Sequence, residues 1–358
     1  EHDLSGQTET ITDRMGNSTI HTYDKTGNIL ATIDSEGQTT KYTYDSFGNK
    51  LSATFADNST LSYSYDERGN RTSITNPLNQ ITKFEFNSNG QKTKITNAQN
   101  DTRIFEYDSS GLLTSFTTES GAILRQEYDR NGNITATYDS KGRLTHRISY
   151  TLEGYPSQVE DASGLIRNSE FDVNGNKISS SFIWNGKTIA SKSTYNDAGQ
   201  EIRREDYNGH GIDLFYDLNG HITKIVDDNG KYEEMTYDLK GNLIQQKYKN
   251  GSIRKIVYDA NNNKIAYTDL HLPGEKTNGT KIILDSLGRE IRIDTVTDMN
   301  ITLSENNSYL EGYGEILTTM QNAYNQHGLV TKSIDNHNQI TTYKYDAAGR
   351  NTKIIDNQ

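Results

Sequence analysis

A set of five residues that could do chemistry falls within 19 positions of this 358-residue chain: Arg203, Arg204, His210, Tyr216 and His221. A polysaccharide lyase needs a Tyr or His as base and a cation or amide that neutralises a uronate. The candidate catalytic residues of such a lyase are His210, Arg203, Tyr216 and His221. The alternative is that both histidines are turn residues, because His210 follows Asn208-Gly209 and His221 follows Gly220. We favour the alternative and expect the chain not to be an enzyme.

Metal and cofactor chemistry find little support. Asp129-x-Asn131-Gly132-Asn133 resembles part of a calcium loop, but an EF-hand also needs a bidentate Glu at its twelfth position. Hairpin turns account for every such segment, and we favour that interpretation. The sequence has no Ser nucleophile elbow, phosphate loop or His-Glu-x-x-His motif. We therefore expect no metal and no cofactor.

Tyrosine is the other conspicuous residue type, with 23 Tyr against 9 Phe and 1 Trp. Flat amphipathic rings along a groove could stack on sugars or contact unfolded polypeptide. The candidate binding residues are Tyr42, Tyr44, Tyr63, Tyr65, Tyr107 and Tyr128. The alternative is that these rings are simply the packing face of a sheet.

The candidate residues belong to a repeated motif, Tyr-Asp-x-x-Gly-Asn, whose usual spacing is 21 residues. Its first position is occupied by Tyr23, Tyr44, Tyr65, Phe86, Tyr107, Tyr128, Tyr150, Phe171, Tyr195, Tyr216, Tyr237, Tyr258, Leu284, Tyr324 and Tyr345. A fixed period of about 20 to 50 residues indicates a repeat array.

One repeat, residues 39–59, predicts a hairpin. Residues 39–44 alternate as a half-buried strand does, residues 45–49 form a turn, and residues 50–55 return. Tyr42 and Tyr44 then share one face, whereas the column that begins with Thr43 and Ser64 is expected to face water. We therefore predict an all-β fold in which antiparallel hairpins form one long, coiled sheet, as an open spiral or partial shell.

Composition agrees with this fold class. Only 32% of the residues are hydrophobic, and 29 Gly against 3 Pro suit strands joined by tight turns. The net charge of −11 argues against nucleic-acid and anionic-membrane partners, and no apolar run is long enough to span a bilayer. Because the chain has no Cys, disulfides are excluded.

The residues Tyr44-Asp45-Ser46-Phe47-Gly48-Asn49 and Tyr237-Asp238-Leu239-Lys240-Gly241-Asn242 resemble the YD repeats of the RHS family. The family includes bacterial Rhs and wall-associated proteins, the BC component of Tc toxins, and teneurins. The resemblance implies a sheet that spirals into a hollow shell, which encloses an effector in the bacterial toxins and serves adhesion in teneurins. It therefore implies polypeptide cargo or neighbouring repeats as partners, and a secreted or surface location in bacteria.

The chain departs from the family pattern in two ways. The Asp-Pro-x-Gly type core motif is missing, and the length is short of a complete cage, so we expect an open spiral from a processed or excised piece. Uncapped repeats at both ends predict edge-to-edge self-association. We treat residues 1–358 as one array, with irregular repeats near 183–195, 268–281 and 290–323. The last is interpreted as a degenerate double repeat, and a glycan-binding role is the alternative to the scaffold.

Overall fold

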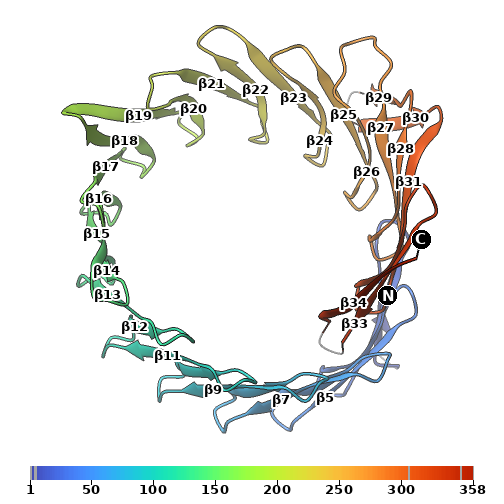
Figure 1. Ribbon diagram of the computed structural model, residues 1–358, viewed down its shortest axis with the longest axis horizontal. Coiled ribbons are helices and arrows are strands. Elements are labelled where there is room, and N and C mark those ends of the chain that lie inside the picture. Colours follow the sequence, from blue (N-terminus) through green and yellow to red (C-terminus); the bar gives the residue numbers. More distant parts are fainter. Residues whose placement is uncertain (1, 4–5, 305–306, 347–348, 358) are drawn as a thin grey trace. The chain divides into compact units, whose positions relative to one another are not determined.

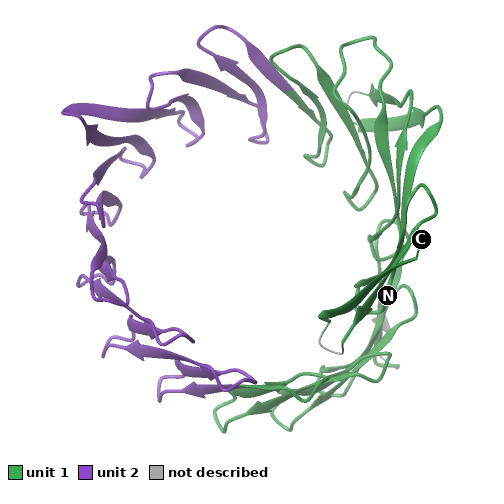
Figure 2. Ribbon diagram, viewed as in Figure 1, with its two compact units in different colours: residues 1–82, 235–358 green, residues 83–234 purple. Residues whose placement is uncertain are grey.

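The computed structural model describes residues 2–3, 6–304, 307–346 and 349–357. These residues form strands, turns and bends, with no helix among them and hence none that could cross a membrane. They divide into two compact units (Figure 2): unit 1 is Glu1–Thr82 with Met235–Gln358, and unit 2 is Lys83–Glu234.

Most strands are five or six residues long, as the repeat predicts. The first nine are β1 (His2–Asp3), β2 (Thr8–Thr12), β3 (Ser18–Tyr23), β4 (Ile29–Ile33), β5 (Thr39–Tyr44), β6 (Lys50–Thr54), β7 (Thr60–Tyr65), β8 (Arg71–Thr75) and β9 (Ile81–Phe86). Unit 2 continues with β10 (Lys92–Thr96), β11 (Thr102–Tyr107), β12 (Leu113–Thr117), β13 (Ile123–Tyr128), β14 (Ile134–Tyr138), β15 (Leu144–Tyr150), β16 (Pro156–Asp161), β17 (Ile166–Phe171), β18 (Lys177–Trp184), β19 (Lys187–Tyr195), β20 (Glu201–Glu205), β21 (Gly211–Tyr216) and β22 (Ile222–Asp227), and β23 (Tyr232–Tyr237) spans the boundary between the units.

The C-terminal part of unit 1 has the same organisation. It contains β24 (Leu243–Lys247), β25 (Ile253–Tyr258), β26 (Lys264–Thr268), β27 (Gly279–Leu284), β28 (Glu290–Val296), β29 (Asn300–Ser304), β30 (Asn307–Gly312), β31 (Ile316–Tyr324), β32 (Val330–Ile334), β33 (Ile340–Tyr345) and β34 (Asn351–Asn357). Within each unit, strands consecutive in the chain pair antiparallel, apart from the β28–β31 region described below (Figure 1). The predicted hairpin array is confirmed.

The predicted turn has a geometry that explains its residue types. In the turn after β5, the Asp45 N–H donates to the Asn49 carbonyl at 3.0 Å and the Gly48 N–H to the Asp45 carbonyl at 3.2 Å. One Asp45 carboxylate oxygen accepts from the N–H groups of Phe47 and Asn49, and the other from the Asn49 side-chain amide. Gly48 has φ +84°, a left-handed conformation that glycine adopts without strain.

A β-bulge lies beside this turn, which simple alternation does not predict. Thr43 pairs with Ser52, but Tyr44 pairs with Lys50, so Leu51 is the extra residue. The same shift recurs in the following hairpin, between Ser64 and Tyr65. A bulge bends its strand and increases the local twist. The next turn, between repeats, has no such bulge, because Thr54 pairs with Thr60 without a shift.

The segment interpreted as a double repeat folds differently. Strand β28 pairs directly with β31, and β29 and β30 form a separate two-stranded sheet. This inserted hairpin packs on β25 and β26 and buries Val257, Ala266, Val296, Met299 and Ile301. The double-repeat interpretation is therefore wrong, although residues 305–306 lie outside the described part of the chain.

The inserted hairpin also covers the face that was expected to be water-facing. Val257 precedes the motif residue Tyr258, as Thr43 precedes Tyr44, yet Val257 is only 5% exposed. The Ser308 hydroxyl donates to the Ile256 carbonyl at 2.5 Å, and the Lys255 ammonium donates to the Ile301 carbonyl at 2.7 Å. The water-facing prediction fails in these repeats because their small and apolar residues form a core with the insertion.

Candidate functional site

The motif tyrosines form a ladder of hydrogen bonds between successive hairpins. The hydroxyl of Tyr44 donates to the Ile29 carbonyl, and that of Tyr65 to the Lys50 carbonyl, both at 2.9 Å. The hydroxyls of Tyr107, Tyr128, Tyr216 and Tyr345 make the equivalent bond 15 residues back along the chain. Burial raises the pKa of Tyr44 and Tyr65 above the ordinary value for tyrosine, which favours the protonated hydroxyl that donates each bond. The ladder explains why this column prefers Tyr over Phe.

The second column of candidate binding residues lies two positions earlier. Lys50 lies over the Tyr42 ring at 4.3 Å from its centroid, and Arg71 lies over the Tyr63 ring at 5.6 Å. All six predicted binding tyrosines are half-buried. The four tyrosines of the motif column donate hydrogen bonds from their hydroxyls to carbonyls of the sheet. The rings of Tyr42 and Tyr63 instead have a cationic side chain packed on one side. These contacts account for the columns structurally, and the binding role stays a prediction.

The predicted lyase residues are divided between the two faces of β20 and β21. Arg203 pairs with Asp213 across the strands, whereas its neighbour Arg204 pairs with Ile212. Ile212 and Tyr216 are four residues apart in β21, so their side chains lie on the same face of the sheet. Tyr216 and Arg204 therefore lie on one face, and Arg203 lies on the other. The Arg203 guanidinium contacts Asp213 and Asp228 at 2.9 Å and Glu205 at 3.2 Å, which raises its pKa. Three carboxylates thus already neutralise the cation that would bind a uronate.

The two histidines lie beyond opposite ends of β21. Each follows an Asp by four residues: the Nδ1 of His210 is 3.6 Å from Asp206, and that of His221 is 3.0 Å from Asp217. The Tyr216 hydroxyl donates to the Glu201 carbonyl at 2.7 Å, and burial raises the pKa of Tyr216. About six residues of strand, or roughly 20 Å, separate the histidines. The geometry therefore favours the turn interpretation, and within the described residues no group of carboxylates and histidines could hold a metal ion.

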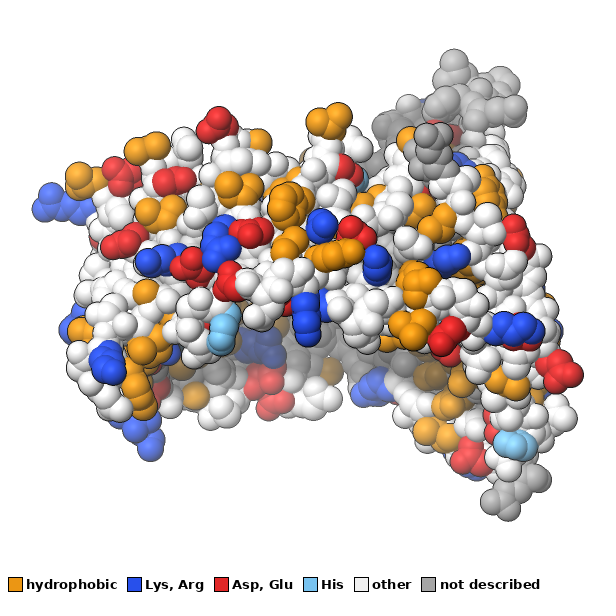
Figure 3. Space-filling model, turned by 90° about the horizontal axis from the view of Figure 1, so that it is seen from above, with side chains coloured by type: hydrophobic (Ala, Val, Ile, Leu, Met, Phe, Trp, Pro, Cys, Tyr) orange, Lys and Arg blue, Asp and Glu red, His pale blue; other side chains and the backbone are white. Residues whose placement is uncertain are grey.

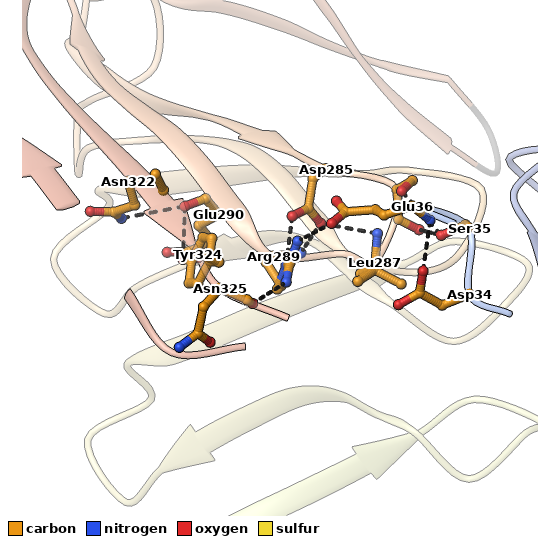
Figure 4. A network of polar contacts seen from close by, with 12 residues as sticks. Asp34, Ser35, Glu36, Asp285, Leu287, Arg289, Glu290, Asn322, Tyr324 and Asn325 are labelled. Carbon is orange, nitrogen blue, oxygen red and sulfur yellow. Dashed lines mark hydrogen bonds and ion pairs between the residues drawn. The ribbon is translucent and has the colours of Figure 1, made fainter. Parts of the chain in front are cut away.

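A different cluster joins the two parts of unit 1 (Figure 4). Arg289 lies at the end of a motif turn, where Asn is the commonest residue, and its Nε contacts Asp285 at 2.6 Å. Its Nη2 contacts Glu36 at 2.8 Å, and its Nη1 donates to the Asn325 carbonyl at 3.3 Å. The Arg289 side chain is only 18% exposed, and its guanidinium lies over the Tyr324 ring. One side chain thus connects turns 253 residues apart.

Further contacts between turns lie in the same region of unit 1. We call the contacts between residues 13–57 and residues 261–327 the seam. Asn261 donates to Asp13 at 2.8 Å, and the Ser35 hydroxyl to that of Ser286 at 3.0 Å. His327 contacts Asp57 at 3.0 Å. Burial opposes ionisation of Asp57, but hydrogen bonds from Ser59 and His327 outweigh it and lower its pKa to about 2. The periodic sequence does not reveal the seam, because Arg350 occupies the same turn position as Arg289.

Charges elsewhere are mixed. On the face drawn in Figure 3, acidic and basic side chains are interspersed, and neither sign forms a continuous stripe.

Comparison with known proteins establishes the class of this all-β array. The sequence profile of the teneurin YD-shell family matches residues 6–214, and that of the RHS repeat matches residues 324–358. The chain therefore belongs to the teneurin YD-shell family, as its repeat motif predicted. No curated protein matches the sequence.

Solved Tc toxin structures have the same fold. A chain of the crystal structure of TcdB2-TccC3 superposes with a TM-score of 0.69 at 15% identity, covering 100% of this chain and 24% of that one. A chain of the Tc holotoxin pore of Photorhabdus luminescens gives 0.68 at 15% identity, covering 95% and 21%. This chain thus spans about a fifth to a quarter of the length of those proteins.

Proposed function

We propose that this chain is a wall segment of a shell that encloses polypeptide cargo, in a bacterial protein that is secreted or held at the cell surface. The seam is the observation that carries the proposal. A wall wound from one chain needs lateral contacts between hairpins far apart in sequence. Arg289, bonded to both Glu36 and Asp285 at a mostly buried position, is a contact of that kind.

The local chemistry supports a scaffold over an enzyme. The motif tyrosines donate to backbone carbonyls, the turn aspartates accept from backbone N–H groups, and Arg203 is surrounded by carboxylates. Polar groups used in this way hold the sheet together and are not free to act on a substrate. Similarity to Tc toxin structures, which shows the fold, adds support for a shell-type role.

Protection of an attached polypeptide tests the proposal. A disordered tail with one site for a sequence-specific protease would be appended after Gln358, and the cleavage rate compared with that of the free tail peptide. We expect cleavage at least tenfold slower on the intact protein. The seam variant Arg289→Ala should restore much of the rate, whereas Arg350→Ala, at the same turn position in another repeat, should not. Cleavage at the free-peptide rate would refute enclosure.

A further inference from the structure

The hairpin of β18 and β19 departs from the repeat in length and in composition. Its strands have eight and nine residues, and they end in Asn185 and Gly186, which both have positive φ. This is the two-residue turn that suits a regular hairpin. The added length carries the only Trp of the chain, Trp184, which pairs with Lys187 and is 62% exposed.

Serines replace the large rings at the base of this hairpin. Where other repeats have Tyr42 or Phe105 two residues before the motif aromatic, this region has Ser169 and Ser193. Ser180 pairs with Ser169 on one side and Ser191 on the other, so the hydroxyls share one face. The missing rings leave a groove of about 340 Å³. Its lining is Lys177, Ser179, Ser180, Ser191, Ser193, Arg204, Glu205, Asp206 and Tyr207.

Aromatic side chains continue the same face toward the hairpin tip. Tyr207, from the turn after β20, donates its hydroxyl to the Ser180 hydroxyl at 3.2 Å. Hydrogen bonds with Ser180 and Ser191 lower the pKa of Tyr207. Its ring meets Phe182 edge to face, with centroids 5.4 Å apart, and stays 43% exposed. Trp184 follows Phe182 by two positions and therefore lies on the same face.

The charges in the groove decide the class of ligand. Lys177 and Arg204 are balanced by Glu205 and Asp206. Arg204 donates to Glu201 at 3.1 Å, and Glu205 contacts Arg203 at 3.2 Å. A strongly charged ligand would meet as many like charges as opposite ones, whereas a neutral, hydroxyl-rich ligand would not.

We propose that this face binds a neutral oligosaccharide. The apolar side of a pyranose ring would stack on Tyr207 or Trp184. The Ser193 hydroxyl already donates to Glu201 and the Ser191 hydroxyl to the Ser180 carbonyl, so sugar hydroxyls would donate to the oxygens of these serines. The site does not require the shell role, and it is distinct from the motif tyrosine columns. It coincides with the irregular segment near 183–195, and departures from a repeat are places where function is often added.

The single tryptophan supplies a direct assay. The full chain would be titrated with cellohexaose, chitohexaose and maltohexaose while Trp184 emission is recorded, with hexagalacturonate as the charged comparison. We expect a saturable shift of emission to shorter wavelength with at least one neutral hexasaccharide. A linear or absent response to all three would overturn the proposal, as would tighter binding of hexagalacturonate.

Variants locate the site by isothermal titration calorimetry. Tyr207→Ala and Trp184→Ala should each raise Kd about tenfold, or about 1.4 kcal/mol. Trp184 is at an exposed tip, so that variant should fold even if the other does not. Phe215→Ala is the matched control, because Phe215 is 50% exposed and lies on the opposite face of the same unit. Unchanged Kd in Trp184→Ala and Tyr207→Ala, or an equal loss in Phe215→Ala, would refute this location.

Discussion

The tyrosine ladder predicts that removing one hydroxyl weakens the contact between two hairpins. In Tyr65→Phe the ring remains, but the hydrogen bond to the Lys50 carbonyl, 2.9 Å long, is lost. A net hydrogen bond contributes about 1 kcal/mol, and a half-buried carbonyl left without its donor adds to the loss. We expect a local destabilisation of about 1–2 kcal/mol.

Native-state hydrogen exchange is the suitable assay, because a repeat array need not unfold in one step. Amide protection in β6–β8 should fall about 5- to 30-fold in Tyr65→Phe. The matched control is Tyr63→Phe, which removes a hydroxyl from the same face of the same strand. Among the described residues, the Tyr63 hydroxyl makes no hydrogen bond. Equal losses in both variants, or no loss in Tyr65→Phe, would refute the ladder as a stabilising contact.

Three further predictions concern the seam and the turns. Arg289→Ala leaves Glu36 without its cation and should destabilise the seam by about 1–3 kcal/mol, measured as faster exchange at residues 34–38, with exchange in unit 2 unchanged. The Asn28 side chain and other donors lower the pKa of Asp24 to about 2. The stabilisation from Asp24 is therefore complete above the unfolded pKa of about 3.9 and is lost as pH falls toward 2; urea midpoints over this range should depend less on pH in Asp24→Asn. Gly69 has φ +81°, so Gly69→Ala should cost about 1–2 kcal/mol in thermal unfolding, more than Gly69→Asn; equal costs would count against backbone strain.

The sequence was most informative where the chemistry is local. The motif Tyr-Asp-x-x-Gly-Asn identified the hairpins and turns, because its Asp, Gly and Asn satisfy one another within five residues. The sequence also argues against the candidate lyase residues forming one site. Arg203 and Arg204 are adjacent in a strand, so they had to lie on opposite faces.

The 21-residue spacing of the motif does not predict the contacts between residues far apart in the sequence. The inserted hairpin β29–β30 carries the alternation typical of a strand pair, and only three-dimensional packing on Val257 and Ala266 shows that it leaves the main sheet. The seam joins Glu36 to Arg289 through charges that occur at many equivalent turns. A single sequence cannot distinguish the one arginine that meets a distant carboxylate from the others.

The seam also sets the order in which this chain can assemble. Each hairpin closes a loop of about five residues and can form as soon as its two strands have been synthesised. The Arg289–Glu36 contact must instead wait for a further 253 residues. During translation, the turns of the early hairpins therefore remain exposed until the residues that cover them have been synthesised. We expect premature association between nascent chains in this interval.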